Sequence, residues 1–187
     1  INNGRDSVRL YGGTLSTFTF LGTSNQIIGG LSETKFENLV LNNSSNVNLG
    51  NNQHIENLLT LTNGRINTGV YKVIITNTSP AAIVGYDSLK YINGNLRRYV
   101  INSTYDIPVG TDDYYERMNI EFQTLSGLTY LDIRYNVDGS QVPPVGLKVN
   151  NKDITEFLNY GYWTIVPSGG TYKYNISCWN KGHTNGG

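Results

Sequence analysis

Three aspartates are the side chains in this sequence best suited to bind a metal ion. Asp112 and Asp113 are adjacent, and Asp138 precedes a glycine in a segment that predicts a turn. Carboxylate oxygens on loops are the ligands that Ca²⁺ prefers. No complete calcium-binding loop surrounds these residues, so solvated turn carboxylates are the favoured interpretation. Calcium is therefore a candidate cofactor at these three positions only.

The histidines and the cysteine, which often act in catalysis or bind metals, lie too far apart in the sequence to predict an active site. His54 and His183 have no second histidine or cysteine at the spacing of a zinc site, and Cys178 is the single cysteine. The chain also lacks the Gly-x-Ser-x-Gly motif of a hydrolase nucleophile. The sequence predicts no catalytic residue and no resident cofactor, and the chain is not expected to be an enzyme.

Aromatic side chains are dense near the end of the chain, and they have two interpretations. Tyr162, Trp163 and Trp179 could present rings on which a sugar stacks. Alternation along a strand would instead turn part of this set inward, where a β-sandwich needs large apolar residues. The core interpretation is favoured, and a carbohydrate-binding module remains the alternative function.

Composition limits both the partners and the class of protein. The formal net charge is zero, with 14 basic and 14 acidic residues, so the basic surface of a general nucleic-acid binder is missing. Charged residues are 15% of the chain, against roughly 25% in typical soluble domains. Twenty-five Asn and 21 Gly supply polarity and turns instead, which is typical of a β-rich extracellular protein. No stretch approaches the ~18 apolar residues of a membrane-spanning helix, so no membrane insertion is expected.

Short apolar runs recur about every 20 residues and predict a stacked β-coil. Leu39 and Leu59 are 20 residues apart, as are Leu41 and Leu61, and Phe18 precedes Leu39 by 21. The spacing then shortens to 17 from Leu49 to Ile66 and to 18 from Ile66 to Val84. Such a period predicts a solenoid in which each repeat pairs with the next. The Asn residues between the runs fit turn geometry best, and hydrogen-bonded Asn ladders are the second interpretation.

The expected fold is all-β, with a short right-handed parallel β-helix followed by an antiparallel β-sandwich-like domain. Residues 1–104 form the coil, and an Asn93-Gly94 turn predicts a hairpin over residues 89–100 that closes its end. Residues 105–187 form the sandwich, from longer strands with turn residues between them. No closing strand follows Trp179, so this domain is expected to be truncated at residue 187.

Six segments, in order, resemble the adhesin-like repeat regions of large secreted cell-surface proteins of Bacteroidota, which are cargo of type IX secretion. They are TFTFLGTSNQIIGG (17–30), FENLVLNN (36–43), LTLTNGRINTG (59–69), YINGNLRR (91–98), DIPVG (106–110) and GYWTIVPSGGTYKYNIS (161–177). The resemblance covers nearly the whole chain, and Ile107 departs from it because the family pattern has Phe there. It implies a β-coil followed by a sandwich at the cell surface, and it supplies no catalytic residue.

The resemblance also implies a modification and a role. Asp6-Ser7-Val8 and Asp87-Ser88-Leu89 match the O-glycosylation pattern of that phylum, so Ser7 and Ser88 are candidate sites of a glycoprotein. The expected role is a non-catalytic structural or adhesive module, either a repeat of a surface adhesin or a subunit of an extracellular filament. Its partners would be copies of itself, neighbouring repeats or surface glycans. A polysaccharide-degrading β-helix enzyme is the remaining alternative, but few carboxylates lie on the predicted coil strands.

Overall fold

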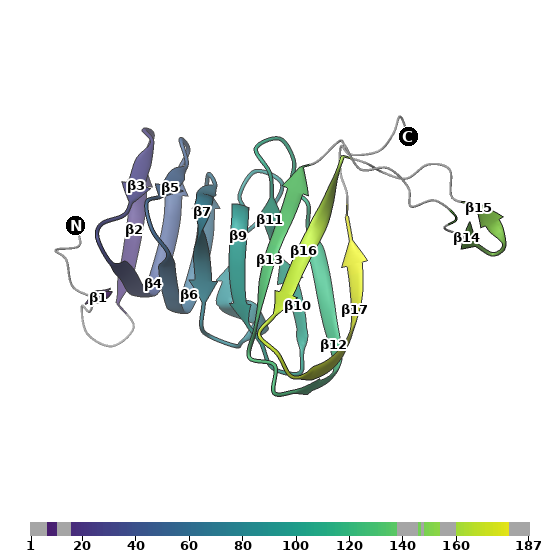
Figure 1. The fold of residues 1–187 in the computed structure, drawn as a ribbon. Helices are drawn as coiled ribbons and strands as arrows, with labels where there is room; N and C mark the ends of the chain where they lie inside the picture. The colour runs from purple at the N-terminus through teal and green to yellow at the C-terminus, as the bar shows by residue number, and fades with distance from the viewer. Residues whose placement is uncertain (1–6, 11–15, 138–145, 147, 154–159, 180–187) are drawn as a thin grey trace.

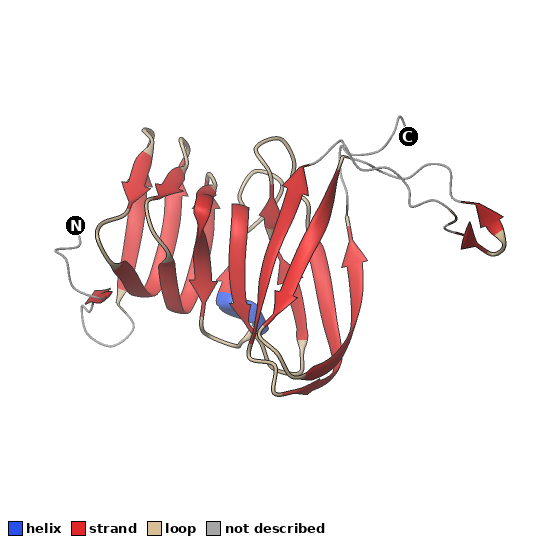
Figure 2. Ribbon diagram, viewed as in Figure 1, coloured by secondary structure: helices blue, strands red, loops and turns tan. Residues whose placement is uncertain are grey.

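The structure is a computed structural model of the 187-residue chain, and it describes residues 7–10, 16–137, 146, 148–153 and 160–179. These residues form β-strands joined by loops and turns, with one short 3₁₀ helix, η1 (Pro80–Ala82) (Figure 2). The strands are β1 (Ser7–Leu10), β2 (Thr17–Gly22), β3 (Gln26–Ile28), β4 (Glu33–Asn43), β5 (Val47–Leu49), β6 (Gln53–Asn63), β7 (Ile66–Ile75), β8 (Ile83–Val84), β9 (Ile92–Tyr99), β10 (Thr104–Ile107), β11 (Val109–Gly110), β12 (Met118–Ser126), β13 (Tyr130–Val137), β14 (Lys148–Val149), β15 (Lys152–Asp153), β16 (Gly161–Pro167) and β17 (Thr171–Cys178). No helix among the described residues is long and apolar enough to cross a membrane.

The N-terminal part is a parallel β-solenoid whose strands form three faces, and one pass through the faces is a rung (Figure 1). The first face stacks β1, residues 33–36 of β4, 53–55 of β6, 73–75 of β7 and 96–98 of β9. The second face stacks β2, residues 38–43 of β4, 58–63 of β6, and β8. The third face stacks β3, β5, residues 66–67 of β7, 92–93 of β9, and β11.

The predicted period of about 20 residues is confirmed where the apolar runs are strongest. Leu39 pairs with Leu59, Leu41 with Leu61, and Phe18 with Leu39. Inward-facing side chains therefore stack into apolar columns, and Leu39, Leu59 and Leu61 are each at most 2% exposed. A column of this kind removes apolar surface from water in every rung, which is why the repeat is visible in the sequence.

The two shorter spacings, from Leu49 to Ile66 and from Ile66 to Val84, do not correspond to paired residues. Ile66 pairs with Val47 and Ile92, and neither Leu49 nor Val84 is its partner. Val84 lies on the second face instead, opposite Thr60. The chain between β7 and β8 makes a long turn through η1, so the fourth rung is longer than the others and equal spacing no longer identifies equal positions.

The predicted hairpin over residues 89–100 is also wrong, because β9 is one continuous strand. Ile92 pairs with Ile66 and Leu96 with Val73, both in parallel, so the two arms belong to different faces of the coil. A two-residue Asn-Gly hairpin of the type I′ class needs positive φ at both turn residues. Only Gly94 has positive φ (120°), while Asn93 does not. The Asn93-Gly94 pair is a corner between the third and first faces.

The C-terminal end of the solenoid continues into antiparallel strands instead of ending in a cap. β13 pairs antiparallel with β9 and β16 with β13, so both extend the first face. β10, β12 and β17 form a separate antiparallel sheet, and β14 and β15 form a small pair of their own. One buried apolar cluster runs from Ile28 in the first turn of the coil to Tyr135 in β13. The coil and the antiparallel strands therefore share a core.

Hydrogen-bonded asparagine ladders connect successive rungs on the outside of the coil. On the third face, Asn67 Nδ2 donates to Asn48 Oδ1 (2.8 Å), and Asn93 Nδ2 donates to Asn67 Oδ1 (3.2 Å). Asn46 has positive φ (69°) and shapes a turn. Both interpretations of the asparagines therefore hold, at different positions. A ladder position repeats with the rung, whereas a turn position depends on local backbone geometry.

Arg98 is a buried cation that closes the long turn of the fourth rung. Its side chain is only 1% exposed, and its guanidinium donates to the carbonyl oxygens of Asn77 and Ser79. The Tyr105 ring lies 4.9 Å from the guanidinium carbon. Burial lowers the pKa of Arg98 to about 10, so the group stays charged at neutral pH. The carbonyl oxygens take the place of the water that the guanidinium loses on burial.

Substitution of Gly94 tests the corner geometry. A Cβ at Gly94 would lie 2.1 Å from Thr68 Oγ1, whereas a Cβ at Gly69, the corner one rung earlier, meets nothing within 4 Å. We expect Gly94→Ala to lower the free energy of unfolding by about 3 kcal/mol or more. Gly69→Ala should cost only about 1 kcal/mol, from its positive φ. Urea unfolding of both variants checks this, and equal losses would contradict the stacked corner.

Replacement of Arg98 tests the buried cation. Arg98→Met keeps an apolar side chain of similar length but leaves the Asn77 and Ser79 carbonyls without these donors. We expect a loss of about 2–4 kcal/mol in the free energy of unfolding. The control is Lys173→Met, which removes an exposed cation from β17 and should change stability by less than about 0.5 kcal/mol. Similar values for both variants would show that the carbonyl contacts contribute little.

Candidate functional site

Of the calcium candidates, Asp112 takes part in the ladder on the third face, and Asp138 lies outside the described residues. Asp112 Oδ1 accepts a hydrogen bond from Asn93 Nδ2 (2.7 Å), and its carbonyl oxygen accepts one from Arg65 Nη1 (2.6 Å). Asp113 lines the same hollow as Arg65. The positive charge of the Arg65 guanidinium would repel a calcium ion bound beside Asp112 and Asp113. Among the described residues, no three His, Cys, Asp or Glu side chains are grouped as metal ligands.

The three candidate sugar-stacking residues do not share a face. Trp163 points inward and packs edge-on against Tyr135, with ring centroids 5.3 Å apart. Tyr162 is 47% exposed on the opposite side of β16. Trp179 follows β17 in the other sheet, and the Arg117 guanidinium lies 4.7 Å from its ring. The structure therefore leaves Tyr162 and Trp179 as separate exposed rings, and Trp163 belongs to the core.

The candidate glycosylation sites are on strands or turns of the coil. Ser88 is exposed in a tight turn that Asp87 and Lys90 close through an antiparallel bridge. Ser7 is the first residue of β1 and lies opposite Glu33. Exposure at Ser88 fits a modification site, and modification of either residue remains a prediction.

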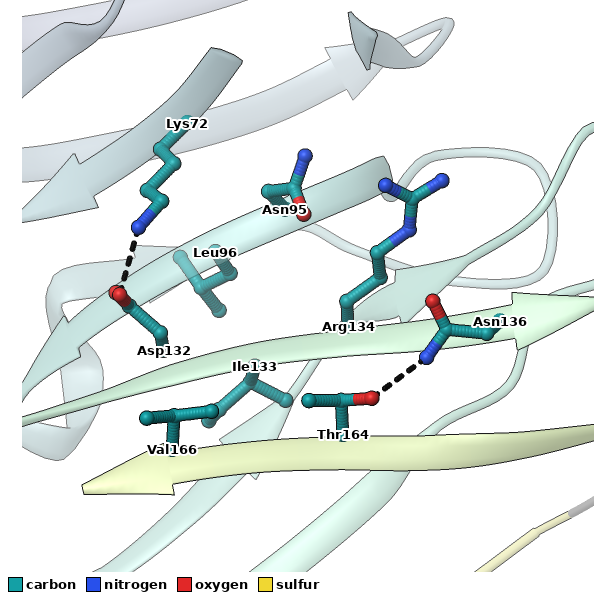
Figure 3. Close-up of a pocket in the computed structure, with 9 residues that line it drawn as sticks. All are labelled: Lys72, Asn95, Leu96, Asp132, Ile133, Arg134, Asn136, Thr164 and Val166. Atoms are coloured by element: carbon teal, nitrogen blue, oxygen red, sulfur yellow. Dashed lines mark hydrogen bonds and ion pairs between the residues drawn. The ribbon is translucent and has the colours of Figure 1, made fainter. Parts of the chain in front are cut away.

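A cleft opens on the outside of the first face where β13 leaves β9. Strand pairing between them ends at Leu96 and Ile133, and residues 134–137 of β13 then continue alone beside β16. We call this hollow the junction cleft; it has a volume of about 220 Å³ (Figure 3). Its lining is Lys72, Asn95, Leu96, Asp132, Ile133, Arg134, Asn136, Thr164 and Val166.

Asp132 anchors one end of the junction cleft through two cations. Lys72 Nζ lies 2.6 Å from its Oδ2, while Arg97 donates to both carboxylate oxygens at 2.7 Å. The Arg97 guanidinium also lies 4.0 Å from the centroid of the Tyr130 ring. Burial alone would raise the pKa of Asp132, but the hydrogen bonds from Arg97 and Lys72 outweigh it and hold the pKa below its usual value.

Arg134 marks the other end of the junction cleft and differs from the other two cations. Its side chain is exposed and makes no ion pair with any described residue. In Figure 3 its guanidinium stands above β13, level with Asn95. Lys72, Arg97 and Arg134 together carry three positive charges against the one negative charge of Asp132, which leaves the cleft with a positive field available to a ligand.

A second carboxylate on the outer surface is held in a comparable way. Asp106 accepts hydrogen bonds from Arg117 (2.9 and 3.0 Å), Tyr86 (2.7 Å) and Asn119 (3.1 Å). Burial would raise the pKa of Asp106, and these donors lower it below the usual value. Burial and the bond to Asp106 raise the pKa of Tyr86 to about 12. Both oxygens of Asp106 are engaged by these donors, so this carboxylate links the side chains around it and offers little to a ligand.

One acidic side chain has its pKa shifted in the opposite direction. Glu116 precedes β12 and is fully buried, at 0% exposed. Burial raises the pKa of Glu116 to about 7, because the ionised form loses its hydration. A raised carboxyl pKa is a feature of general acids, but a side chain enclosed in this way cannot meet a polymeric substrate.

Sequence reasoning missed the junction cleft, although it found Tyr162 nearby. The lining residues come from four strands, β7, β9, β13 and β16, and no short motif joins them. The nearest sequence signal was alternation along Tyr130–Val137, which places Asp132, Arg134 and Asn136 on one side of a strand. Pairing that side with Lys72 required knowing that β13 lies beside the coil.

Comparison with known proteins gave no match: no family model, no curated protein and no solved structure corresponds to this chain.

Glu116 makes stability depend on pH near neutrality. Its folded pKa is above its usual value, so between about pH 5 and pH 7 the folded chain keeps a proton that the unfolded chain has released. Its contribution therefore makes the free energy of unfolding fall as pH rises through this window, by about 1–3 kcal/mol. Glu116→Gln should remove that slope in urea unfolding at pH 5 and pH 8.

The matched control is Glu121→Gln, an exposed carboxylate on the adjoining strand β12. This variant should keep the wild-type slope. Retention of the slope in Glu116→Gln would show that another group carries the pH dependence.

Proposed function

We propose that this chain is a non-catalytic structural module of an extracellular, surface-exposed assembly. It would act either as a repeat of a large adhesin or as a subunit of a filament. The proposal takes the coil as right-handed and the antiparallel strands as a sandwich-like unit that ends it. The resemblance to Bacteroidota surface proteins adds type IX secretion and O-glycosylation at Ser7 and Ser88 to the proposal.

The observation that carries the proposal is the outward surface of the first rung, formed by β1, β2 and β3. Leu21 and Ile27 point outward there and are 66% and 71% exposed. The residues paired with them one rung on are Asn42 and Asn48. The polar side chains that cover later rungs are thus replaced by apolar ones at the end of the stack. Exposed apolar groups gathered at one end favour contact with another protein surface.

The backbone at the same end supports this interpretation. β2 pairs only with β4 and β3 only with β5, so within the described residues their other edges have no strand partner. An edge of this kind can accept a further strand through its free backbone groups. In Figure 1 it lies at the opposite end of the molecule from β16 and β17.

The occupant that fits this end is another module of the same kind. The coil itself grows by adding one parallel rung to the next, with apolar columns continuing inward. A second module could continue both the strand pairing and the columns. Contact between unlike ends is heterologous, and repetition of such a contact gives an open linear assembly.

Three of the carboxylates among the described residues fit a non-catalytic role. Glycosidases need a carboxylic acid and a carboxylate that flank one substrate bond. Asp106 and Asp132 lie on the surface with lowered pKa values and engaged oxygens, while Glu116, which has the raised pKa, is buried. An acid and a base facing one groove are therefore not formed from this set.

Assembly can be tested by changing the first rung to match the second. The double variant Leu21→Asn/Ile27→Asn introduces the residues found at the paired positions. Burial of a Leu or Ile side chain contributes about 1.5–3 kcal/mol, so we expect association between copies to weaken at least about tenfold. Sedimentation velocity over a concentration series, with negative-stain electron microscopy of the same samples, measures the effect.

The control is Val70→Asn/Ile101→Asn, which makes two exposed apolar residues polar away from the first rung. It should assemble as the wild type does. A wild-type chain that stays monomeric at every concentration would contradict the filament subunit. The adhesin repeat would then be tested with two copies joined in tandem.

A further inference from the structure

The junction cleft combines features that the structural role does not use. Its floor lies between two outward-facing rows of side chains, one on β13 and one on β16. Strand register places Asp132 opposite Val166, Arg134 opposite Thr164, and Asn136 opposite Tyr162. Along β16 the row is Val166, Thr164 and then the exposed Tyr162. A charged and polar row therefore faces a row that is apolar at one end and aromatic at the other.

The charge of the cleft favours an anionic ligand. Asp132 is already bound by Lys72 and Arg97, so its negative charge is compensated. Arg134 adds a cation that makes no ion pair with any described residue. A planar guanidinium binds a carboxylate through two parallel N–H···O bonds, which makes it the natural partner of that group.

The asparagine side chains of the cleft are suited to accept hydrogen bonds from the hydroxyl groups of a ligand. Asn95 uses its amide nitrogen on the carbonyl oxygens of Gly69 and Tyr71, both at 3.0 Å, which leaves its Oδ1 to accept. Asn136 Nδ2 donates to Thr164 Oγ1 (2.8 Å), and its Oδ1 is likewise an acceptor. Figure 3 shows Asn95 between Lys72 and Arg134, and Asn136 beyond Arg134, where it faces Thr164.

The size and walls of the cleft select a single ring. Its volume of about 220 Å³ is below the roughly 300–1,000 Å³ of pockets for drug-sized ligands. Val166 is 52% exposed and gives the cleft an apolar wall against which the C–H face of a sugar can pack, whereas Leu96 and Ile133 are buried, at 0% and 2% exposed. Tyr162, at the end of the β16 row, is placed to stack on a neighbouring ring.

We propose that the junction cleft binds a carboxylated sugar of an acidic polysaccharide. The carboxylate pairs with Arg134, the ring lies against Val166, and hydroxyls reach Asn95 and Lys72. Tyr162 covers the next sugar along the chain. The inference rests on the adhesive role proposed above and gives that role a ligand class, but it uses a different surface from the first rung.

Isothermal titration calorimetry with tetragalacturonic acid tests the ligand chemistry. The matched ligand is its methyl ester, which has the same rings and no negative charge. We expect the acid to bind at least about tenfold more tightly than the ester, because a charge-assisted bidentate pair is lost. Equal binding of the two, or no binding of the acid at millimolar concentration, would overturn the proposal.

Variants assign the binding to the cleft. Arg134→Gln should weaken binding of the acid about tenfold or more, and Tyr162→Ala should weaken it several-fold. Lys173→Gln removes another exposed cation, from β17 on the other sheet, and should leave binding unchanged. Equal losses in Arg134→Gln and Lys173→Gln, or binding of dextran sulfate as tight as that of the acid, would show general charge attraction and overturn the proposal.

The two proposals fail separately. Arg134→Gln should leave sedimentation and fibre formation as in the wild type, and Leu21→Asn/Ile27→Asn should still bind tetragalacturonic acid. Loss of sugar binding in a chain that assembles normally would remove only the ligand. Loss of assembly in a chain that binds the sugar would remove only the first-rung contact.

Discussion

The rest of the structure depends on parallel pairing between rungs in a fixed register. Each coil strand hydrogen-bonds to the strand one rung on, so residues at the same position stack in columns. On the inside the second face carries Phe18, Leu39, Leu59 and Ile83. On the outside the third face carries an asparagine ladder. A slip of one residue would exchange the two kinds of column, and the loss of buried apolar contacts prevents it.

The coil ends by a change of strand direction, and the junction cleft is its consequence. β13 adds to β9 antiparallel, but only along the part of β9 that lies on the first face. The other part turns at Gly94 onto the third face and pairs with β11. β13 therefore has a partner on one side only beyond Ile133, and a cleft opens there. The Lys72–Asp132–Arg97 contacts link both sides of the change in direction.

Two ionisable groups are buried near this transition, and they are accommodated differently. Arg98 keeps its charge because the carbonyl oxygens of Asn77 and Ser79 surround it. Glu116 lies in a region where burial favours the neutral acid, so its pKa rises toward neutrality. At this transition Arg98 is thus buried in its charged form, with backbone carbonyl oxygens in place of water, and burial favours the neutral form of Glu116.

The sequence by itself determined the all-β class, the solenoid and its period in the first three rungs, because inward columns repeat the same apolar residues at a fixed spacing. It also indicated that part of the aromatic set turns inward, but it did not single out Trp163, which it kept among the candidate sugar-stacking residues. It misplaced both pairings of Ile66: the partner in the preceding rung is Val47 and not Leu49, and the long turn through η1 moves the partner in the next rung to Ile92. It read Asn93-Gly94 as a hairpin because a corner uses the same residues as a hairpin. Only the tertiary structure brought Lys72, Asn95, Arg134 and Thr164 together. Their strands become neighbours through pairing over long sequence separations, which leaves no local pattern in the sequence.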